Sequence, residues 1–133
     1  MYTVTKRIDF CYGHRLLNYE GKCRHLHGHN GLVEVTLAGD ELDRRGMLTD
    51  FGDIKRLMKH WIDENLDHRM ILCKEDPALD YIQSAGEPHF VLDENPTAEA
   101  IARLIYVRAK ELQLPVKRIT LWETPDSWAA YQE

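Results

Sequence analysis

A short segment rich in metal-binding side chains constrains this chain more than any other feature. Residues 22–29 place one thiol and three imidazoles within eight positions. These residues are Cys23, His25, His27 and His29. In an extended strand, side chains two positions apart point to the same face, so all four would share one face if the segment is extended. An alternating β-type run at 31–37 follows directly, which predicts a sheet with imidazoles at the mouth of one strand.

The spacing of these histidines suits a metal ion. His27 and His29, one residue apart on a strand, can give two nitrogens to one ion, and His14 ends another strand-like run and is a candidate third ligand. Three histidines with one open position are typical of a catalytic zinc site. Cys23 is then either a fourth ligand or a catalytic group nearby. The alternative is that some histidines are ordinary surface residues, with His25 the first candidate.

Composition restricts the class of protein. The chain has 133 residues, which suits one domain spanning 1–133, and it is 44% apolar and 29% charged, as expected for a globular protein. A net charge of −5 gives no indication of a nucleic-acid partner. No apolar run is long enough for a membrane span, and the first residues lack a signal-peptide core. Three widely spaced cysteines predict reduced thiols and a cytoplasmic location.

Local patterns predict an order of β, β, α, an irregular stretch, α and β. The expected strands are 3–13, 28–38 and 116–123, with a candidate fourth at 127–131. Asp50 and Thr97 are predicted N-caps of two amphipathic helices, the second ended by Pro115. The stretch 74–95 reads as a long loop with a short strand at 90–92. So few strands would leave open sheet edges, which predicts pairing with other subunits.

Two further features carry candidate chemistry. Asp67 and His68 pair a carboxylate with an imidazole just past the first helix, which suits acid–base work but also fits a surface pair. Glu123 continues the inward row of Ile119 and Leu121, yet it is charged. Such a residue is usually solvated. If it is buried, it is expected to hold the donors of a ligand, because an unpartnered buried carboxylate is costly.

Six short motifs occur in a fixed order along nearly the whole chain. They are Phe10…His14, Cys23-x-x-x-His27-Gly28-His29, Gly46-Met47-x-x-Asp50-Phe51, Leu66-Asp67-His68, Asn95-Pro96-Thr97-x-Glu99 and Glu123-Thr124. Each motif is weak alone, but together they resemble the 6-pyruvoyl-tetrahydropterin synthase / 6-carboxy-tetrahydropterin synthase family. The resemblance implies the α+β tunnelling fold: a four-stranded antiparallel sheet with two helices on one face. Three chains would close a β-barrel, and two trimers would stack as a homohexamer with active sites between subunits.

The resemblance also implies residue roles and a reaction. The implied zinc ligands are His14, His27 and His29, the implied catalytic residues are Cys23, Asp67 and His68, and the implied substrate-binding residues are Glu123, Thr124 and Thr97. The expected reaction converts 7,8-dihydroneopterin triphosphate to 6-carboxy-5,6,7,8-tetrahydropterin, with release of acetaldehyde and triphosphate, on the route to queuosine. The alternatives are a 6-pyruvoyl-tetrahydropterin synthase and a non-catalytic zinc- or pterin-binding module.

The chain departs from the family pattern at three places. In Phe10-Cys11-Tyr12-Gly13-His14, small residues are more usual before the histidine, and the bulk of Tyr12 is expected to narrow the pocket. His25 adds an imidazole, and the segment 72–94 is longer than in compact bacterial members. For the triphosphate, the candidate basic residues are Lys22, Arg24 and Arg15.

Overall fold

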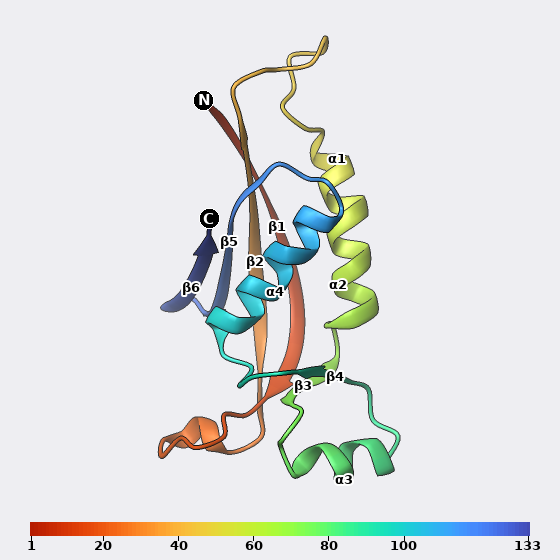
Figure 1. Ribbon diagram of the computed structural model, residues 1–133, viewed down its shortest axis with the longest axis vertical. Helices are drawn as coiled ribbons and strands as arrows, with labels where there is room; N and C mark the ends of the chain where they lie inside the picture. Colours follow the sequence, from red (N-terminus) through yellow and green to blue (C-terminus); the bar gives the residue numbers. More distant parts are fainter.

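The computed structural model describes residues 1–133, and its centre is a pair of long antiparallel strands (Figure 1). Strand β1 (Tyr2–His14) pairs with β2 (His27–Gly39) along its whole length. Alternate side chains of β1 are buried from Ile8 to His14, as the period of a half-buried strand requires. The predicted strands 3–13 and 28–38 are therefore confirmed, each extended by one residue at both ends.

The sheet has six strands in the order β4-β3-β1-β2-β5-β6. Strands β5 (Val116–Thr124) and β6 (Ser127–Gln132) continue the antiparallel part, which confirms both predicted strands. Strands β3 (Arg69–Cys73) and β4 (His89–Leu92) add to the other side in parallel. The expectation of a four-stranded antiparallel sheet is therefore wrong. Strand β3 escaped prediction because it is short and its last three residues are all buried, so it shows no alternation.

The stretch 74–95 is also more ordered than predicted. It contains α3 (Ala78–Ser84), and β4 includes the predicted strand at 90–92. Helix α3 connects two parallel strands, which cannot be joined by a tight hairpin. The sequence signal for α3 is weak because the helix is short and buries only Ile82. The interpretation of 74–95 as one long loop is therefore wrong.

Two helical units cover one face of the sheet. The first runs through α1 (Phe51–Ile54), a π-helical segment η2 (Lys55–Lys59) and α2 (His60–Asn65), and the second is α4 (Ala98–Glu111). Both predicted N-caps are confirmed: Gly52 N–H donates to Asp50 Oδ1 at 2.7 Å, and Ala100 N–H donates to Thr97 Oγ1 at 3.1 Å. None of the helices combines the length and apolar character that a membrane crossing needs.

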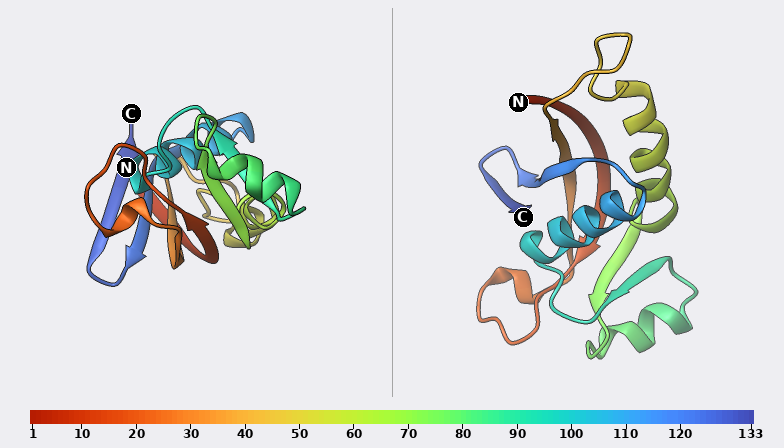
Figure 2. Two further views of the ribbon diagram at one scale, coloured as in Figure 1. Left: turned by 90° about the horizontal axis from the view of Figure 1, so that it is seen from below. Right: turned by 45° about the horizontal axis from the view of Figure 1, so that its top comes forward.

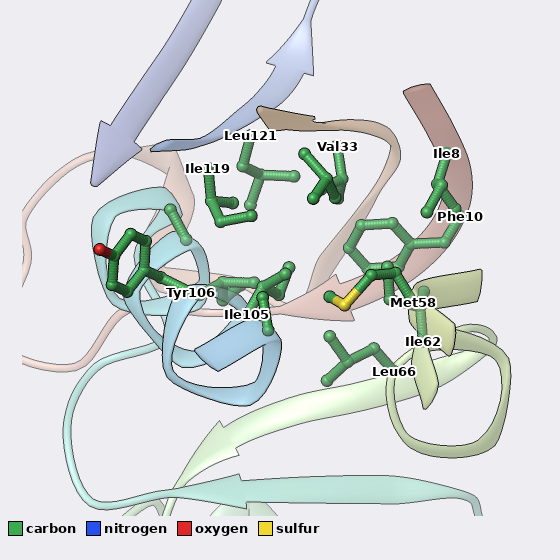
Figure 3. Close-up of a cluster of buried hydrophobic side chains, with 14 of the residues drawn as sticks. Ile8, Phe10, Val33, Met58, Ile62, Leu66, Ile105, Tyr106, Ile119 and Leu121 are labelled. Atoms are coloured by element: carbon green, nitrogen blue, oxygen red, sulfur yellow. The ribbon is translucent and has the colours of Figure 1, made fainter. Parts of the chain in front are cut away.

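The core lies between these helices and the sheet (Figure 3). Met58 and Ile62 of the first unit and Ile105 of α4 are fully buried and face strand residues such as Val33 and Leu121. Fully burying a side chain of this size stabilises the fold by about 1.5–3 kcal/mol. Strands β1 and β2 are therefore rigid supports for the residues at their ends.

The opposite face of the sheet carries polar side chains. Arg7 Nε donates to Glu34 Oε2 at 3.0 Å, and Trp122 Nε1 donates to the other oxygen of Glu34 at 2.8 Å. Figures 1 and 2 show both helical units over the same face of the sheet, with the short 3₁₀ turn η1 (Lys22–Arg24) and α3 at the end where β1 finishes and β2 begins. The predicted histidine cluster lies at that end.

Candidate metal centre

Three histidines meet where β1 ends and β2 begins. His14 is directly opposite His27 in the sheet register, and His29 is opposite Tyr12. One ring nitrogen from each of the three histidines lies within 4.8 Å of the others. The ring centroids are 4.6 Å apart for His14 and His27, 5.1 Å for His14 and His29, and 5.0 Å for His27 and His29. The period of the strands therefore brings together all three predicted ligands.

Backbone carbonyls fix the tautomers of two of these rings. His14 Nδ1 is 2.6 Å from the Pro96 carbonyl, and His27 Nδ1 is 2.7 Å from the His25 carbonyl. Because a carbonyl only accepts, each Nδ1 must carry the proton, which leaves Nε2 with a free lone pair. The Nε2 atoms of His14, His27 and His29 are all buried without a hydrogen-bond partner. An outer hydrogen bond of this kind is the usual way to orient a metal-ligating histidine.

Burial favours the neutral form of two of the three histidines. Burial lowers the pKa of His14 to about 4, and the neighbouring imidazoles add to this effect against the hydrogen bond to Pro96. Burial also lowers the pKa of His29, although the nearby charge of Glu123 opposes this. Imidazole binds a metal ion only in its neutral form. Three buried and unpaired imidazole nitrogens are a donor set that fits zinc, which favours imidazole and tetrahedral sites with an open position.

The segment before His27 is not a strand. Lys22–Arg24 form the 3₁₀ turn η1, because the His25 N–H bonds back to the Lys22 carbonyl at 3.1 Å. The predicted common face of Cys23, His25, His27 and His29 is therefore wrong for its first two members. The His25 side chain is exposed, but its carbonyl orients His27. A backbone role of this kind has no sequence signal.

One cavity collects most of the predicted substrate-site residues. It measures about 480 Å³, within the range of small-molecule sites, and its lining includes His14, Cys23, Thr97 and Glu123. Glu123 Oε2 lies 3.8 Å from His29 Nε2, beyond hydrogen-bonding distance, so the carboxylate remains available to a ligand. Thr124 is outside this lining. Its side chain is in the β5–β6 turn, where Oγ1 accepts the Asp126 N–H at 3.2 Å.

Asp67 and His68 lie elsewhere, beside Cys11 of β1. Asp67 Oδ2 accepts the His68 Nδ1–H at 2.8 Å, and His68 Nε2 is 3.4 Å from Cys11 Sγ. These residues are not in the cavity of Cys23. His68 and Cys11 instead line a second cavity of about 620 Å³, to which His27 and His29 also contribute. The sequence interpretation paired Asp67 with His68 correctly but missed Cys11.

Tyr12 packs beneath the histidines instead of at an entrance. Its side chain is buried, its ring contacts those of His14 and His29, and its hydroxyl has no partner. Burial and the charge of Glu123 raise the pKa of Tyr12 well above its ordinary value, so it remains a neutral phenol. Tyr12 therefore forms a bulky wall beneath the predicted ligands His14 and His29.

The expected triphosphate residues are only partly free. Arg15 forms a bidentate pair with the carboxylate of Asp76, whose side chain is fully buried. Arg24 Nε donates to His25 Nε2 at 3.3 Å, and its guanidinium also reaches the Glu20 carbonyl at 3.4 Å. Arg15 therefore has a structural role in this chain. Of the three candidate residues, Lys22 is the one whose side chain is exposed and forms no hydrogen bond within the chain.

The cluster and the fold together define an α+β protein with a candidate metal centre and small-molecule cavities beside it. Residues 3–133 match the family model described as 6-pyruvoyl tetrahydropterin synthase. A relative from Rickettsia bellii named 6-carboxy-5,6,7,8-tetrahydropterin synthase is 42% identical and covers 95% of this chain and 96% of its own. A relative of the same name from Haemophilus influenzae is 35% identical over the full length of both chains.

Solved structures agree with this assignment. A protein of unassigned function from Wolinella succinogenes superposes with a TM-score of 0.83 at 32% identity, and it covers 99% of this chain and 98% of its own. The 6-pyruvoyl tetrahydropterin synthase of Caenorhabditis elegans superposes with a TM-score of 0.74 at 23% identity, with 99% and 95% coverage, and so shows the shared fold. The chain belongs to the 6-pyruvoyl tetrahydropterin synthase family.

Proposed function

We propose that this protein is a 6-carboxy-5,6,7,8-tetrahydropterin synthase. It would act on 7,8-dihydroneopterin triphosphate and release acetaldehyde and triphosphate, on the route to queuosine. The observation that carries this proposal is the convergence of three unpaired histidine nitrogens beside a cavity that holds a thiol and a free carboxylate. Two relatives that match almost the whole chain are named 6-carboxy-5,6,7,8-tetrahydropterin synthase, which supports this activity over the 6-pyruvoyl alternative.

His14, His27 and His29 would hold one zinc ion through their Nε2 atoms. Bound zinc would supply Lewis-acid chemistry, which favours negative charge on a substrate oxygen. The chain's own contribution is to orient the rings of His14 and His27 through the Pro96 and His25 carbonyls, and to favour the neutral form of His14 by burying it. His25 itself would not bind the metal, because its ring is exposed, does not belong to the cluster and accepts from Arg24.

Cys23 would act as the acid–base group of the cavity. Its sulfur lines the same cavity as His14 and Glu123, and it is half-buried, so a ligand can reach it. A thiol that transfers a proton must be reachable by the substrate and partly protected from water, and a half-buried position in the cavity lining is compatible with both needs. General acid–base groups typically contribute about 10²–10⁴-fold to a rate.

Glu123 would anchor the pterin ring. A pterin edge presents adjacent N–H donors, and a carboxylate can accept two such donors side by side. Thr97 would assist from the same cavity: its oxygen already accepts the helix N–H of Ala100, which leaves its O–H free to donate. We assign Thr124 a place at the mouth, because it follows Glu123 in the exposed hairpin turn.

Asp67 and His68 would assist catalysis from a neighbouring chain. The His68 side chain is 77% exposed and lies apart from the Cys23 cavity of its own chain. A side chain this exposed is free to reach the Cys23 cavity of an adjacent subunit. We therefore propose a homohexamer of two trimers, whose barrels would be lined by the polar face of the sheet, with each chain a single domain in the cytoplasm. A stable monomer in light scattering at low micromolar concentration would contradict this assembly.

Product analysis tests the function. The zinc-loaded protein is incubated with 7,8-dihydroneopterin triphosphate, and the products are identified by mass spectrometry. The proposal expects the 6-carboxy product together with acetaldehyde. The His27→Ala variant is the matched control and should form neither. A 6-pyruvoyl product would establish the related synthase instead, and binding of the substrate without turnover would establish a non-catalytic module.

A further inference from the structure

Cys11 is held by the Asp67–His68 pair through three of its atoms. Its backbone N–H donates to Asp67 Oδ1 at 2.9 Å, and its carbonyl accepts the His68 backbone N–H at 2.7 Å. Its sulfur lies 3.4 Å from His68 Nε2. These bonds join β1 to the turn between α2 and β3, so the thiol and the imidazole are fixed relative to each other.

The proton arrangement of this group follows from its contacts. Burial raises the pKa of Asp67, but the Cys11 N–H and the His68 ring together outweigh it and hold that pKa below its ordinary value, so the carboxylate is ionised. An ionised carboxylate only accepts, so His68 Nδ1 carries the proton in the bond to Asp67 Oδ2. His68 Nε2 then presents its lone pair to the Cys11 S–H. The order is thiol, imidazole, carboxylate.

This order is the structural signature of an activated nucleophile: a nucleophile within hydrogen-bond reach of a base, and the base oriented by a third group. We propose that Cys11 is an activated thiol that forms covalent adducts with small electrophiles, such as alkylating agents and aldehydes. The proposed synthase activity uses Asp67 and His68 but gives Cys11 no role, and Cys23 does not belong to this cluster.

The chemical step balances within the three side chains and the electrophile. With an alkyl iodide, the thiol proton moves to His68 Nε2, sulfur bonds to carbon, the carbon–iodine bond breaks and iodide leaves. With an aldehyde, sulfur bonds to the carbonyl carbon, the C=O π electrons move to oxygen, and His68 returns the proton to that oxygen to give a hemithioacetal. Neither step needs an oxidant or a reductant.

The surroundings distinguish Cys11 from the other two thiols. Cys11 is half-buried and lines the cavity of about 620 Å³, so a small molecule can reach it. Cys73 is buried on β3, only 7% exposed. Cys23 is half-buried like Cys11, but its cavity lining contains neither His68 nor Asp67. Access alone would make Cys11 and Cys23 react alike, whereas the base would make Cys11 faster.

His68 also has an unusual backbone that helps in choosing a variant. Its φ is +58°, in the left-handed region that residues other than glycine and asparagine adopt at an energetic cost. Strain of this kind persists where the surrounding structure enforces it, often at functional sites. His68→Asn removes the base while suiting this backbone, so the variant should fold. His60→Asn, on the exposed surface of α2, is the matched control.

Alkylation with limiting iodoacetamide tests the proposal without any pterin. The zinc-loaded protein is sampled over time, and peptide mass spectrometry gives the labelling rate of each cysteine. We expect Cys11 to react at least tenfold faster than Cys23, and His68→Asn to reduce the Cys11 rate at least tenfold, since a general base typically contributes about 10²–10⁴-fold. His60→Asn should leave all rates unchanged.

Two results would overturn the proposal. One is an equal Cys11 rate in the wild type and in His68→Asn, with both folded by circular dichroism. The other is labelling of Cys23 at the same rate as Cys11 in the wild type. Asp67→Asn is the second variant, and it should also slow Cys11, by less than His68→Asn. If either result is obtained, the synthase proposal is unaffected, because the product assay does not depend on the labelling of Cys11.

Discussion

The buried pair of Arg15 and Asp76 gives a stability prediction that can be worked from the structure. Arg15 follows His14, a predicted metal ligand, and Asp76 precedes α3. The Asp76 side chain is fully buried and accepts two guanidinium donors as well as the Ala78 N–H at 2.8 Å. The pair therefore fastens the chain beside the metal centre to the segment that joins β3 and β4. Asp76→Asn keeps the shape of the side chain and removes its charge.

The expected cost of Asp76→Asn is about 2–3 kcal/mol. Removing one partner of a buried ion pair typically costs about 3–5 kcal/mol. The cost here should be lower because the Arg15 side chain is 25% exposed, so water can solvate part of the guanidinium, and because asparagine retains one acceptor oxygen. With a urea slope of about 1–3 kcal/mol per M, the unfolding midpoint should fall by about 1–2 M.

Urea unfolding of the two proteins at equal concentration measures this cost. Glu94→Gln is the matched control: it breaks another bidentate pair, with Arg103, whose side chains are 47% and 50% exposed. An exposed pair contributes at most about 1 kcal/mol, so the midpoint should fall less in this variant.

The effect of Asp76→Asn should also depend on pH. The hydrogen bonds from Arg15 lower the pKa of Asp76 below its ordinary value, so the unfolded chain binds the proton more readily. The stabilisation is therefore complete above about pH 4 and is lost as the pH falls further. The gap between wild type and variant should narrow in that range. Equal midpoints for Asp76→Asn and Glu94→Gln at pH 7 would refute the reasoning.

Four further predictions concern the site itself. His27→Ala should lose its zinc and His25→Ala should keep it, as measured by elemental analysis; the reverse result would refute the ligand assignment. Cys23→Ala should retain zinc and lose about 10²–10⁴-fold in turnover, and loss of the metal as well would make this thiol a ligand. Glu123→Gln should keep its zinc and bind a pterin at least tenfold more weakly by calorimetric titration, because the amide replaces an acceptor with a donor; unchanged affinity would place the pterin elsewhere. In the metal-free protein, NMR should show His14 titrating near pH 4. The stability of the fold should then decline as the pH falls below about 6.5, because the unfolded chain takes up this proton before the folded chain does. Titration of His14 near pH 6.5 would contradict its burial.

The sequence by itself determined the features that depend on local periodicity. Strands β1 and β2 follow from alternating apolar residues, and the helix starts at Asp50 and Thr97 follow from side chains that cap nearby N–H groups. The three predicted metal ligands follow for the same reason: the two-residue spacing places His27 and His29 on one face of β2, and the pairing of His14 with His27 brings the third imidazole beside them.

The tertiary structure decided what depends on contacts between distant segments. Strand β3 is buried on the sheet, which removes the alternation that would have revealed it, and only the fold pairs it in parallel with β1 and β4. The Pro96 carbonyl that orients His14 comes from 82 residues away, and Asp67, which binds the backbone of Cys11, comes from 56 residues away. Side-chain type and spacing specify which groups can do chemistry. Which of these groups meet, as Cys11 meets His68 and Cys23 does not, depends on how the chain packs.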